Sequence, residues 1–142
     1  MAIYQKKTLR VVSIIMVVLL LLCTVTPFAS AKGSAYIECY LTSMTAGSNG
    51  VVTAAFQITG TGTMDEIGAT TVTIYENGSI VKTFSYTNTS GMMGYNKVIH
   101  GSTVSYNGTV GKSYSAFVVF KAGKNGDWDN RSMSTSSVTA KN

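Results

Sequence analysis

The chain has 142 residues, enough for one domain, with 11 basic and 6 acidic residues and a formal net charge of +5. Three basic residues, Lys6, Lys7 and Arg10, lie at the very start, and no later Lys/Arg cluster is dense enough to neutralise several phosphates, which argues against a nucleic-acid partner. Cysteine occurs only at Cys23 and Cys39, so the chain is not one of the small extracellular scaffolds held by several disulfides.

The first 31 residues have the pattern of a secretory signal peptide. A basic start precedes the apolar run V-V-S-I-I-M-V-V-L-L-L-L-C (11–23), and A-S-A (29–31) supplies a small-x-small cleavage site. We predict cleavage after Ala31, secretion, and a domain over 32–142 that touches a membrane only through the signal peptide before cleavage. The alternatives are an uncleaved anchor, although the run is shorter than the ~20 residues that span a bilayer, and lipidation of Cys23.

Beyond residue 31 the apolar residues recur with period two, which is typical of half-buried strands. We expect the following residues to share buried faces: Ile37, Cys39 and Leu41; Val52, Ala54, Phe56 and Ile58; Val72 and Ile74; Tyr114, Ala116, Val118 and Phe120. Asn-Gly pairs, which readily adopt the positive φ angles of tight turns, lie at 49–50, 77–78, 107–108 and 125–126. Together they predict seven antiparallel strands, over roughly 35–44, 51–59, 69–76, 79–86, 98–105, 112–121 and 131–139.

One stretch resembles a known family. G-K-S-Y-S-A-F-V-V-F-K-A-G-K-N-G-D-W-D-N-R-S (111–132) is similar to the F strand, FG loop and start of the G strand of fibronectin type III and related immunoglobulin-like domains. Gly111 lies three residues before Tyr114, as in the Gly-x-x-Tyr step of that family. The resemblance implies an all-β, immunoglobulin-like sandwich of seven strands, in which Tyr114 is the corner tyrosine whose hydroxyl bonds to nearby backbone.

The chain also departs from that family. Val110 stands where the family usually has proline, and Gly108 stands where it has leucine. Phe56 replaces the strand-B tryptophan, and Ala116 occupies the second cysteine position of the immunoglobulin disulfide, so that bridge is impossible. The stretches I-G-A-T-T-V-T-I-Y-E-N-G and T-S-G-M-M-G resemble short, uncharacterised secreted proteins of Gram-positive anaerobes, which implies export from a bacterium and carries no activity.

Few residues offer catalytic chemistry. The only histidine, His100, is expected to face outward on an edge or to bond to a backbone carbonyl. Cys39 alternates with Ile37 and Leu41, which predicts a buried and inert thiol. We therefore predict no catalytic residue, no cofactor and no metal, with a small secreted hydrolase as the least favoured reading. A calcium site is kept as an alternative hypothesis, with four candidate ligands: Asp65, Glu66, Asp127 and Asp129.

The implied fold gathers unusual residues at one end. In a fibronectin-like sandwich the connections over 59–68, 87–97 and 122–130 share one end, where rigid sandwiches present binding loops. They carry Asp65, Glu66, Met92, Met93, Tyr95, Asp127, Trp128 and Asp129. Trp128 would anchor a sugar or a protein partner, and the two methionines would supply adaptable apolar contact. The alternative is that Trp128 folds back over the end of the sandwich and that at least one methionine plugs the core.

The sequence thus predicts a secreted, non-enzymatic binding module whose unknown ligand is a protein or glycan at the cell surface. The alternative is a structural or matrix-type protein that assembles through strand edges. The stretch S-M-S-T-S-S-V-T-A (132–140) supports that alternative, because it has few charges to guard an edge strand against pairing. Phe117 and Val119 would form a second apolar stripe if they are exposed.

The cleavage prediction is tested by intact-mass spectrometry of the exported protein. We expect a mature chain that begins at Lys32, because signal peptidase cuts after the small residue at the end of A-S-A. A mature form that still contains Met16 would contradict this prediction and favour the membrane-anchored alternative.

Overall fold

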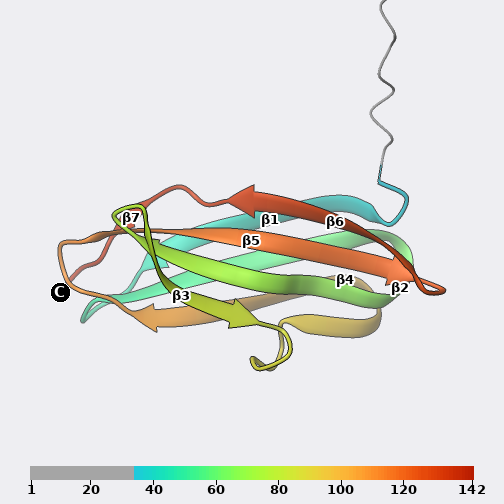
Figure 1. Ribbon diagram of the computed structural model, residues 1–142, viewed down its shortest axis with the longest axis horizontal. Coiled ribbons are helices and arrows are strands. Elements are labelled where there is room, and N and C mark those ends of the chain that lie inside the picture. The colour runs from blue at the N-terminus through green and yellow to red at the C-terminus, as the bar shows by residue number, and fades with distance from the viewer. Residues whose placement is uncertain (1–33) are drawn as a thin grey trace, which may run out of the picture. The chain divides into compact units, whose positions relative to one another are not determined.

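The computed structural model describes residues 34–142, which form seven β-strands and no helix (Figure 1). The strands are β1 (Ile37–Ala46), β2 (Val51–Glu76), β3 (Ser79–Ser85), β4 (Met93–Asn107), β5 (Ser113–Lys124), β6 (Asp127–Ser134) and β7 (Val138–Thr139). Within this range no helix exists that is long and apolar enough to span a membrane. The predicted signal peptide lies outside the described residues.

Strand β2 connects the two halves of one antiparallel sheet. Its first part, up to Gly60, pairs with β1 and with the second part of β4. Its last part pairs with β5 from Glu66 and with β3 from Thr71, and β6 and β7 extend the sheet beyond β5. The sheet therefore consists of the group β1–β2–β4 and the group β3–β2–β5–β6, joined by one strand that runs through both (Figure 1).

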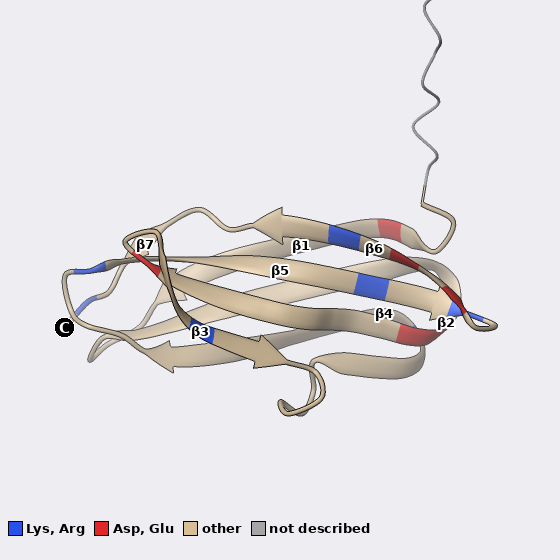
Figure 2. Ribbon diagram, in the orientation of Figure 1, with Lys and Arg blue, Asp and Glu red and all other residues tan. Residues whose placement is uncertain are grey.

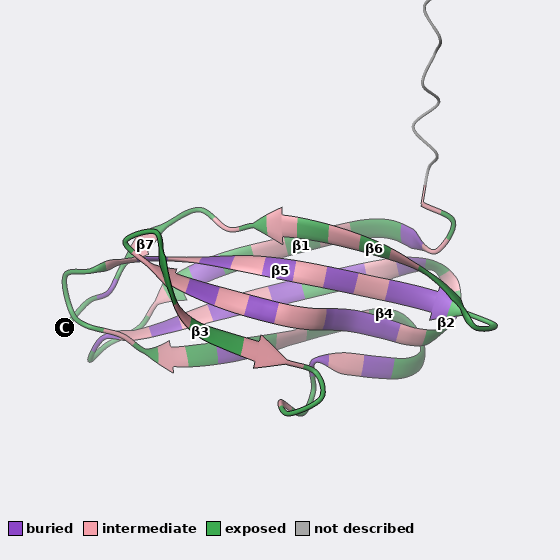
Figure 3. Cartoon of the chain, viewed as in Figure 1, coloured by how far each residue is buried: buried purple, intermediate pink, exposed green. Residues whose placement is uncertain are grey.

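The two groups curl around a shared apolar core. Strands β1 and β5 are not paired, yet the ring of Tyr40 lies 5.2 Å from that of Phe120, and Phe56 approaches Phe120 at 6.2 Å. The predicted buried faces of β2 and β5 are confirmed, and the alternation is visible along both strands in Figure 3. These buried residues are Val52, Ala54, Phe56, Ile58, Val72, Ile74, Tyr114, Ala116, Val118 and Phe120.

The prediction of a loop over 59–68 is wrong, because this segment belongs to β2. Pairing with β4 shifts from Thr59 opposite Ile99 to Met64 opposite Lys97, so residues 60–63 form an irregular bend within a continuous strand. Met64 is buried at this bend and contributes to the core. The Gly- and Thr-rich composition of the segment predicts a turn, whereas pairing with β4 at Thr59 and again from Met64 makes it part of one strand.

The boundaries of the later strands also differ from the prediction. Asn125 and Gly126 have φ angles of 56° and 78°, and they form a two-residue turn that joins β5 directly to β6. Most of the expected loop over 122–130 is therefore strand. The single last strand predicted over 131–139 is instead the end of β6 followed, after a break, by the short β7.

The expected burial of Cys39 is wrong as well. Cys39 is exposed and free, because a β-bulge between Ile37 and Cys39 shifts the register of β1. An extra residue in a strand moves every following side chain to the opposite face. Ile37 and Met44 consequently face the core, while Leu41 is 51% exposed.

Tyr114 makes the corner contact that the family resemblance implies. The amide of Thr109 donates a hydrogen bond of 2.7 Å to the Tyr114 hydroxyl, which in turn donates to the carboxylate of Glu76. Burial, followed by the bond to Glu76, raises the pKa of Tyr114 above its usual value, so the hydroxyl stays protonated. A Cβ atom on Gly108 would lie 2.5 Å from the Tyr114 ring, so a side chain at position 108 would displace that ring.

Replacing Tyr114 with phenylalanine tests this corner. Tyr114→Phe keeps the buried ring but leaves the Thr109 amide and Glu76 without their partner, so we expect a loss of about 1–3 kcal/mol in the free energy of unfolding. Urea denaturation measures the loss. The control Tyr86→Phe, at an exposed tyrosine, should change the value by less than about 0.5 kcal/mol. Equal effects of the two substitutions would contradict a special role for the corner.

Candidate functional site

The candidate site lies where the β5–β6 hairpin meets β2. The two-residue turn fixes the register of the hairpin, so that Gly123 lies opposite Trp128. Gly123 also lies opposite Glu66 on β2. Directly paired residues of antiparallel strands point to the same face. Glu66, Gly123 and Trp128 therefore form one row on the outer face of the sheet.

The row continues onto a fourth strand, because Glu66 is also paired with Tyr95 of β4. Trp128 is 51% exposed and Tyr95 is 56% exposed. A Cβ atom on Gly123 would lie 2.6 Å from Cβ of Trp128, so only glycine fits beneath the tryptophan. The row therefore has an exposed aromatic side chain at each end, and Gly123 between them contributes no side chain. We call these four residues (Tyr95, Glu66, Gly123 and Trp128) the aromatic row.

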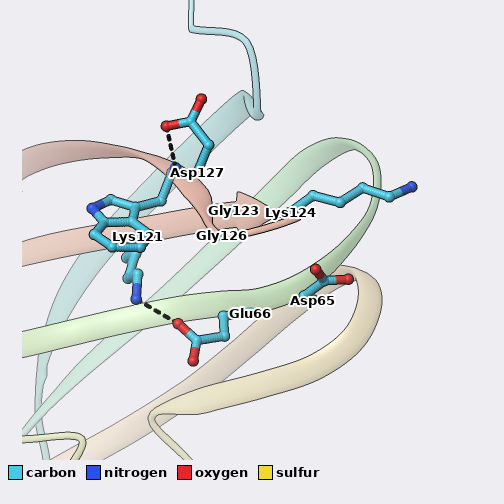
Figure 4. Close-up of a pocket in the computed structure, with 8 residues that line it drawn as sticks. Asp65, Glu66, Lys121, Gly123, Lys124, Gly126 and Asp127 are labelled. Atoms are coloured by element: carbon cyan, nitrogen blue, oxygen red, sulfur yellow. Dashed lines mark hydrogen bonds and ion pairs between the residues drawn. The ribbon is translucent and has the colours of Figure 1, made fainter.

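Lys121 fixes the indole of Trp128. Its ammonium lies 4.5 Å from the centre of the Trp128 ring and also forms an ion pair with Glu66 (Figure 4). The Lys121 side chain is 17% exposed and that of Glu66 is 41% exposed. A cation over an indole contributes about 0.5–1 kcal/mol at an exposed site, and an exposed ion pair about as much or less. Together these contacts orient the ring more than they stabilise the fold.

A pocket of about 230 Å³ opens beside this cluster, and its lining carries charges of both signs. It is lined by Asp65, Glu66, Lys121, Gly123, Lys124, Gly126, Asp127 and Trp128. Figure 4 shows that the Lys124 side chain extends away from the Lys121–Glu66 pair, while Glu66 and Asp65 lie on the β2 side. Acidic and basic residues are interspersed at this end of β2, β5 and β6 (Figure 2).

Asp127 and Asp129 tie the chain segment before β1 to β6. Asp129 Oδ2 accepts hydrogen bonds from the Ser34 hydroxyl at 2.6 Å and from the Tyr36 amide at 3.0 Å. These bonds, the Ser34 bond first, hold the pKa of Asp129 below its usual value. The Tyr36 hydroxyl donates to Asp127 Oδ2 at 3.1 Å, which raises the pKa of Tyr36. Asp129 thus binds the segment before β1 and does not line the pocket. Asp127 also bonds to that segment, and it does line the pocket.

The four carboxylates of the calcium hypothesis are not gathered into a site. Glu66 is paired with Lys121, and Asp65 Oδ2 accepts a bond of 2.7 Å from the Asn125 amide. Among residues 34–142 no group of three or more His, Cys, Asp or Glu side chains is placed to hold a metal ion.

The two adjacent methionines have different positions. Met92 is fully buried in the core, whereas Met93 is half-buried at the start of β4. The carbonyl of Met92 accepts a hydrogen bond of 2.9 Å from the Ala69 amide, which docks the connection before β4 onto β2. This agrees with the expectation that at least one methionine plugs the core. Neither methionine lines the pocket.

His100 and Cys39 do not form a dyad. His100 is paired with the buried Ile58 and therefore lies on the inner face, where its Nε2 bonds to the Gly91 carbonyl at 2.8 Å. This is one of the two environments expected for it. Cys39 is paired with Thr59 on the outer face. Phe117 and Val119, considered as a second apolar stripe, are both half-buried.

The sequence did not identify Lys121 or Gly123 as site residues. Both lie in a stretch read as the end of a strand and the start of a loop. The signal was the Asn-Gly pair at 125–126, because a two-residue turn implies that Gly123 and Trp128 are opposite each other. Comparison of the chain with family models, with curated proteins and with solved structures gives no match.

The methionine assignment is tested by two parallel substitutions. Met92→Ala removes a fully buried side chain, so we expect a loss of about 2–5 kcal/mol in the free energy of unfolding. Met93→Ala, in the neighbouring half-buried position, should cost clearly less. Urea denaturation of both variants gives the comparison. A larger loss for Met93→Ala would show that the plug is assigned to the wrong methionine.

Proposed function

We propose that this chain is an exported, non-enzymatic binding module that recognises its ligand through the aromatic row and the adjoining pocket. The observation that carries the proposal is the half-exposed Trp128. Lys121 orients its ring beside a pocket that is lined by acidic and basic side chains. Exposed tryptophan held in a fixed orientation is typical of the residues that dominate binding energy. Export rests on the signal-peptide pattern of residues 1–31.

We also propose that the curled sheet is an immunoglobulin-like sandwich of the fibronectin type III kind. The groups β1–β2–β4 and β3–β2–β5–β6 correspond in strand order to the two sheets of that fold, with the two parts of β2 as its strands B and C. The bond between the Thr109 amide and the Tyr114 hydroxyl supports this assignment. In such a fold a rigid sheet presents the aromatic row, so the side chains need little rearrangement on binding.

The proposal of no enzymatic activity rests on the environments of the two most reactive side chains. His100 is engaged by a backbone carbonyl on the inner face, and Cys39 lies on the outer face. A nucleophile requires a base within hydrogen-bonding reach. The opposite orientations of Cys39 and His100 do not meet that requirement.

A second candidate function is assembly through the β1–β2–β4 group. Where Cys39–Ala46 of β1 and Ile99–Asn107 of β4 pair with β2, the outer-face side chains are uncharged, from Cys39 and Leu41 to Ile99, while the charged Glu38 and Lys97 lie just beyond this stretch. Leu41 and Ile99 are 51% and 53% exposed. Uncharged surface next to edge strands favours self-association. Such assembly would not involve Trp128, which lies on the other group of strands.

Substitution of Trp128 tests the proposed function. We expect Trp128→Ala to weaken the binding of the labelled mature protein to the cells that export it by about tenfold or more, as loss of a central aromatic anchor does. Flow cytometry measures the binding, and circular dichroism checks that the fold is kept. The matched control is Ile80→Ala. Ile80 is 64% exposed and lies on β3, next to the turn that joins β2 to β3 and outside the aromatic row. Unchanged cell binding by Trp128→Ala would contradict the proposal and favour assembly.

A further inference from the structure

We propose that the ligand of the aromatic row is an uncharged saccharide chain that lies across strands β6, β5, β2 and β4. This inference rests on the proposed function and names its ligand class. Three features carry it: the spacing of the two aromatic side chains, the mixed charges between them and the size of the pocket.

The first feature is the spacing of the aromatic row. Trp128 and Tyr95 are separated by three strand-to-strand steps, and neighbouring strands lie ~4.8 Å apart, so the two Cα positions are roughly 14 Å from each other. One sugar ring cannot reach both side chains, whereas a chain of several linked rings can. The flat C–H face of a sugar ring packs on an aromatic ring as other apolar groups do, and its hydroxyls remain free for polar contacts.

The second feature is the pairing of opposite charges in the middle of the row. Lys121 and Glu66 form an ion pair. An anionic ligand at this place would be repelled by Glu66, and a cationic ligand would be repelled by Lys121. A sugar hydroxyl is both donor and acceptor, and it can bond to both members of the pair. Lys121 has three N–H donors, and the hydrogen bonds found within residues 34–142 use only one oxygen of Glu66. This pair therefore retains bonding capacity for an uncharged polyol.

The third feature is the size of the pocket. Its volume of about 230 Å³ is below the ~300–1,000 Å³ of pockets that enclose a drug-sized ligand. It accommodates one ring of a chain, with the remaining rings outside it. Gly123 supports this placement, because it lowers the middle of the row between Glu66 and Trp128. The ring in the pocket then lies beside the Lys121–Glu66 pair, with its neighbours on Trp128 and toward Tyr95.

The intrinsic fluorescence of the protein gives a direct readout, since Trp128 is its only tryptophan. The mature protein is titrated with four uncharged tetrasaccharides, built on glucose, galactose, mannose or N-acetylglucosamine. The matched charged probes are the glucosamine tetramer, which is cationic, and the galacturonate tetramer, which is anionic. We expect at least one uncharged tetrasaccharide to change the fluorescence and to bind about tenfold more tightly than its own monosaccharide, because it reaches both aromatic side chains. Both charged tetramers should bind more weakly than that probe.

The variant Tyr95→Ala tests whether the chain crosses the strands. We expect it to reduce the affinity for the tetrasaccharide nearly to that of the monosaccharide, and to leave the affinity for the monosaccharide at Trp128 unchanged. Tyr86→Ala, at another exposed tyrosine outside the aromatic row, is the matched control and should change neither affinity. Equal effects of Tyr95→Ala on both probes, or none on either, would overturn the proposed path of the chain.

The ligand class and the proposed function can fail separately. If Trp128→Ala loses cell binding but no uncharged saccharide binds or competes at millimolar concentration, the saccharide proposal is overturned and the binding function stands. Competition by a peptide, or tighter binding of a charged tetramer, would likewise overturn the ligand class alone. If Trp128→Ala binds cells as the unmodified protein does, the binding function itself fails.

Discussion

The structure depends on the continuity of strand β2, which pairs with other strands in both halves of the sheet. Residues 64–68 of this strand pair with β4, and from Glu66 onward the strand also pairs with β5. Glu66 therefore has a hydrogen-bonded strand on each side. If residues 59–68 formed a loop, as the Gly- and Thr-rich sequence predicts, Glu66 would not pair with both β4 and β5. No strand would then hold Tyr95 and Trp128 at a fixed separation. Their positions are instead fixed to each other by backbone hydrogen bonds between paired strands, so binding at the proposed site would not require ordering of a loop, which costs binding energy.

The core could be predicted from the sequence because alternation alone determines which face of a long strand is buried. Tyr114 through Phe120 and Val52 through Ile58 needed no further information. Cys39 could not be predicted, since a one-residue bulge after Ile37 inverts the pattern and leaves no compositional trace. The same reasoning applies to the bend at 60–63, because it lies between two stretches of β2 that pair with β4, a strand distant in sequence.

The candidate site was predictable only in part, for a related reason. The pairing of Gly123 with Trp128 follows from the two-residue turn at 125–126, which is local information. The pairing of Glu66 with Gly123 and with Tyr95 is long-range, and it depends on the irregular register at the bend. The sequence singled out Trp128 and Tyr95 as unusual residues but left open whether Trp128 folds back over the core, and in the structure both side chains are exposed. It grouped them with Asp129, which the structure shows bonded to the segment before β1.

Met92 links the core to the aromatic row. Met92 is buried, and its carbonyl is bonded to the Ala69 amide, so the start of β4 has one fixed position on β2. Tyr95 follows three residues later, and its pairing with Glu66 depends on that starting point. A cavity left by the loss of the Met92 side chain would therefore loosen the β4 end of the aromatic row, while Trp128 would remain held by the β5–β6 turn. Met92 does not line the pocket, but it helps to hold Tyr95 opposite Glu66 because it docks the start of β4 onto β2.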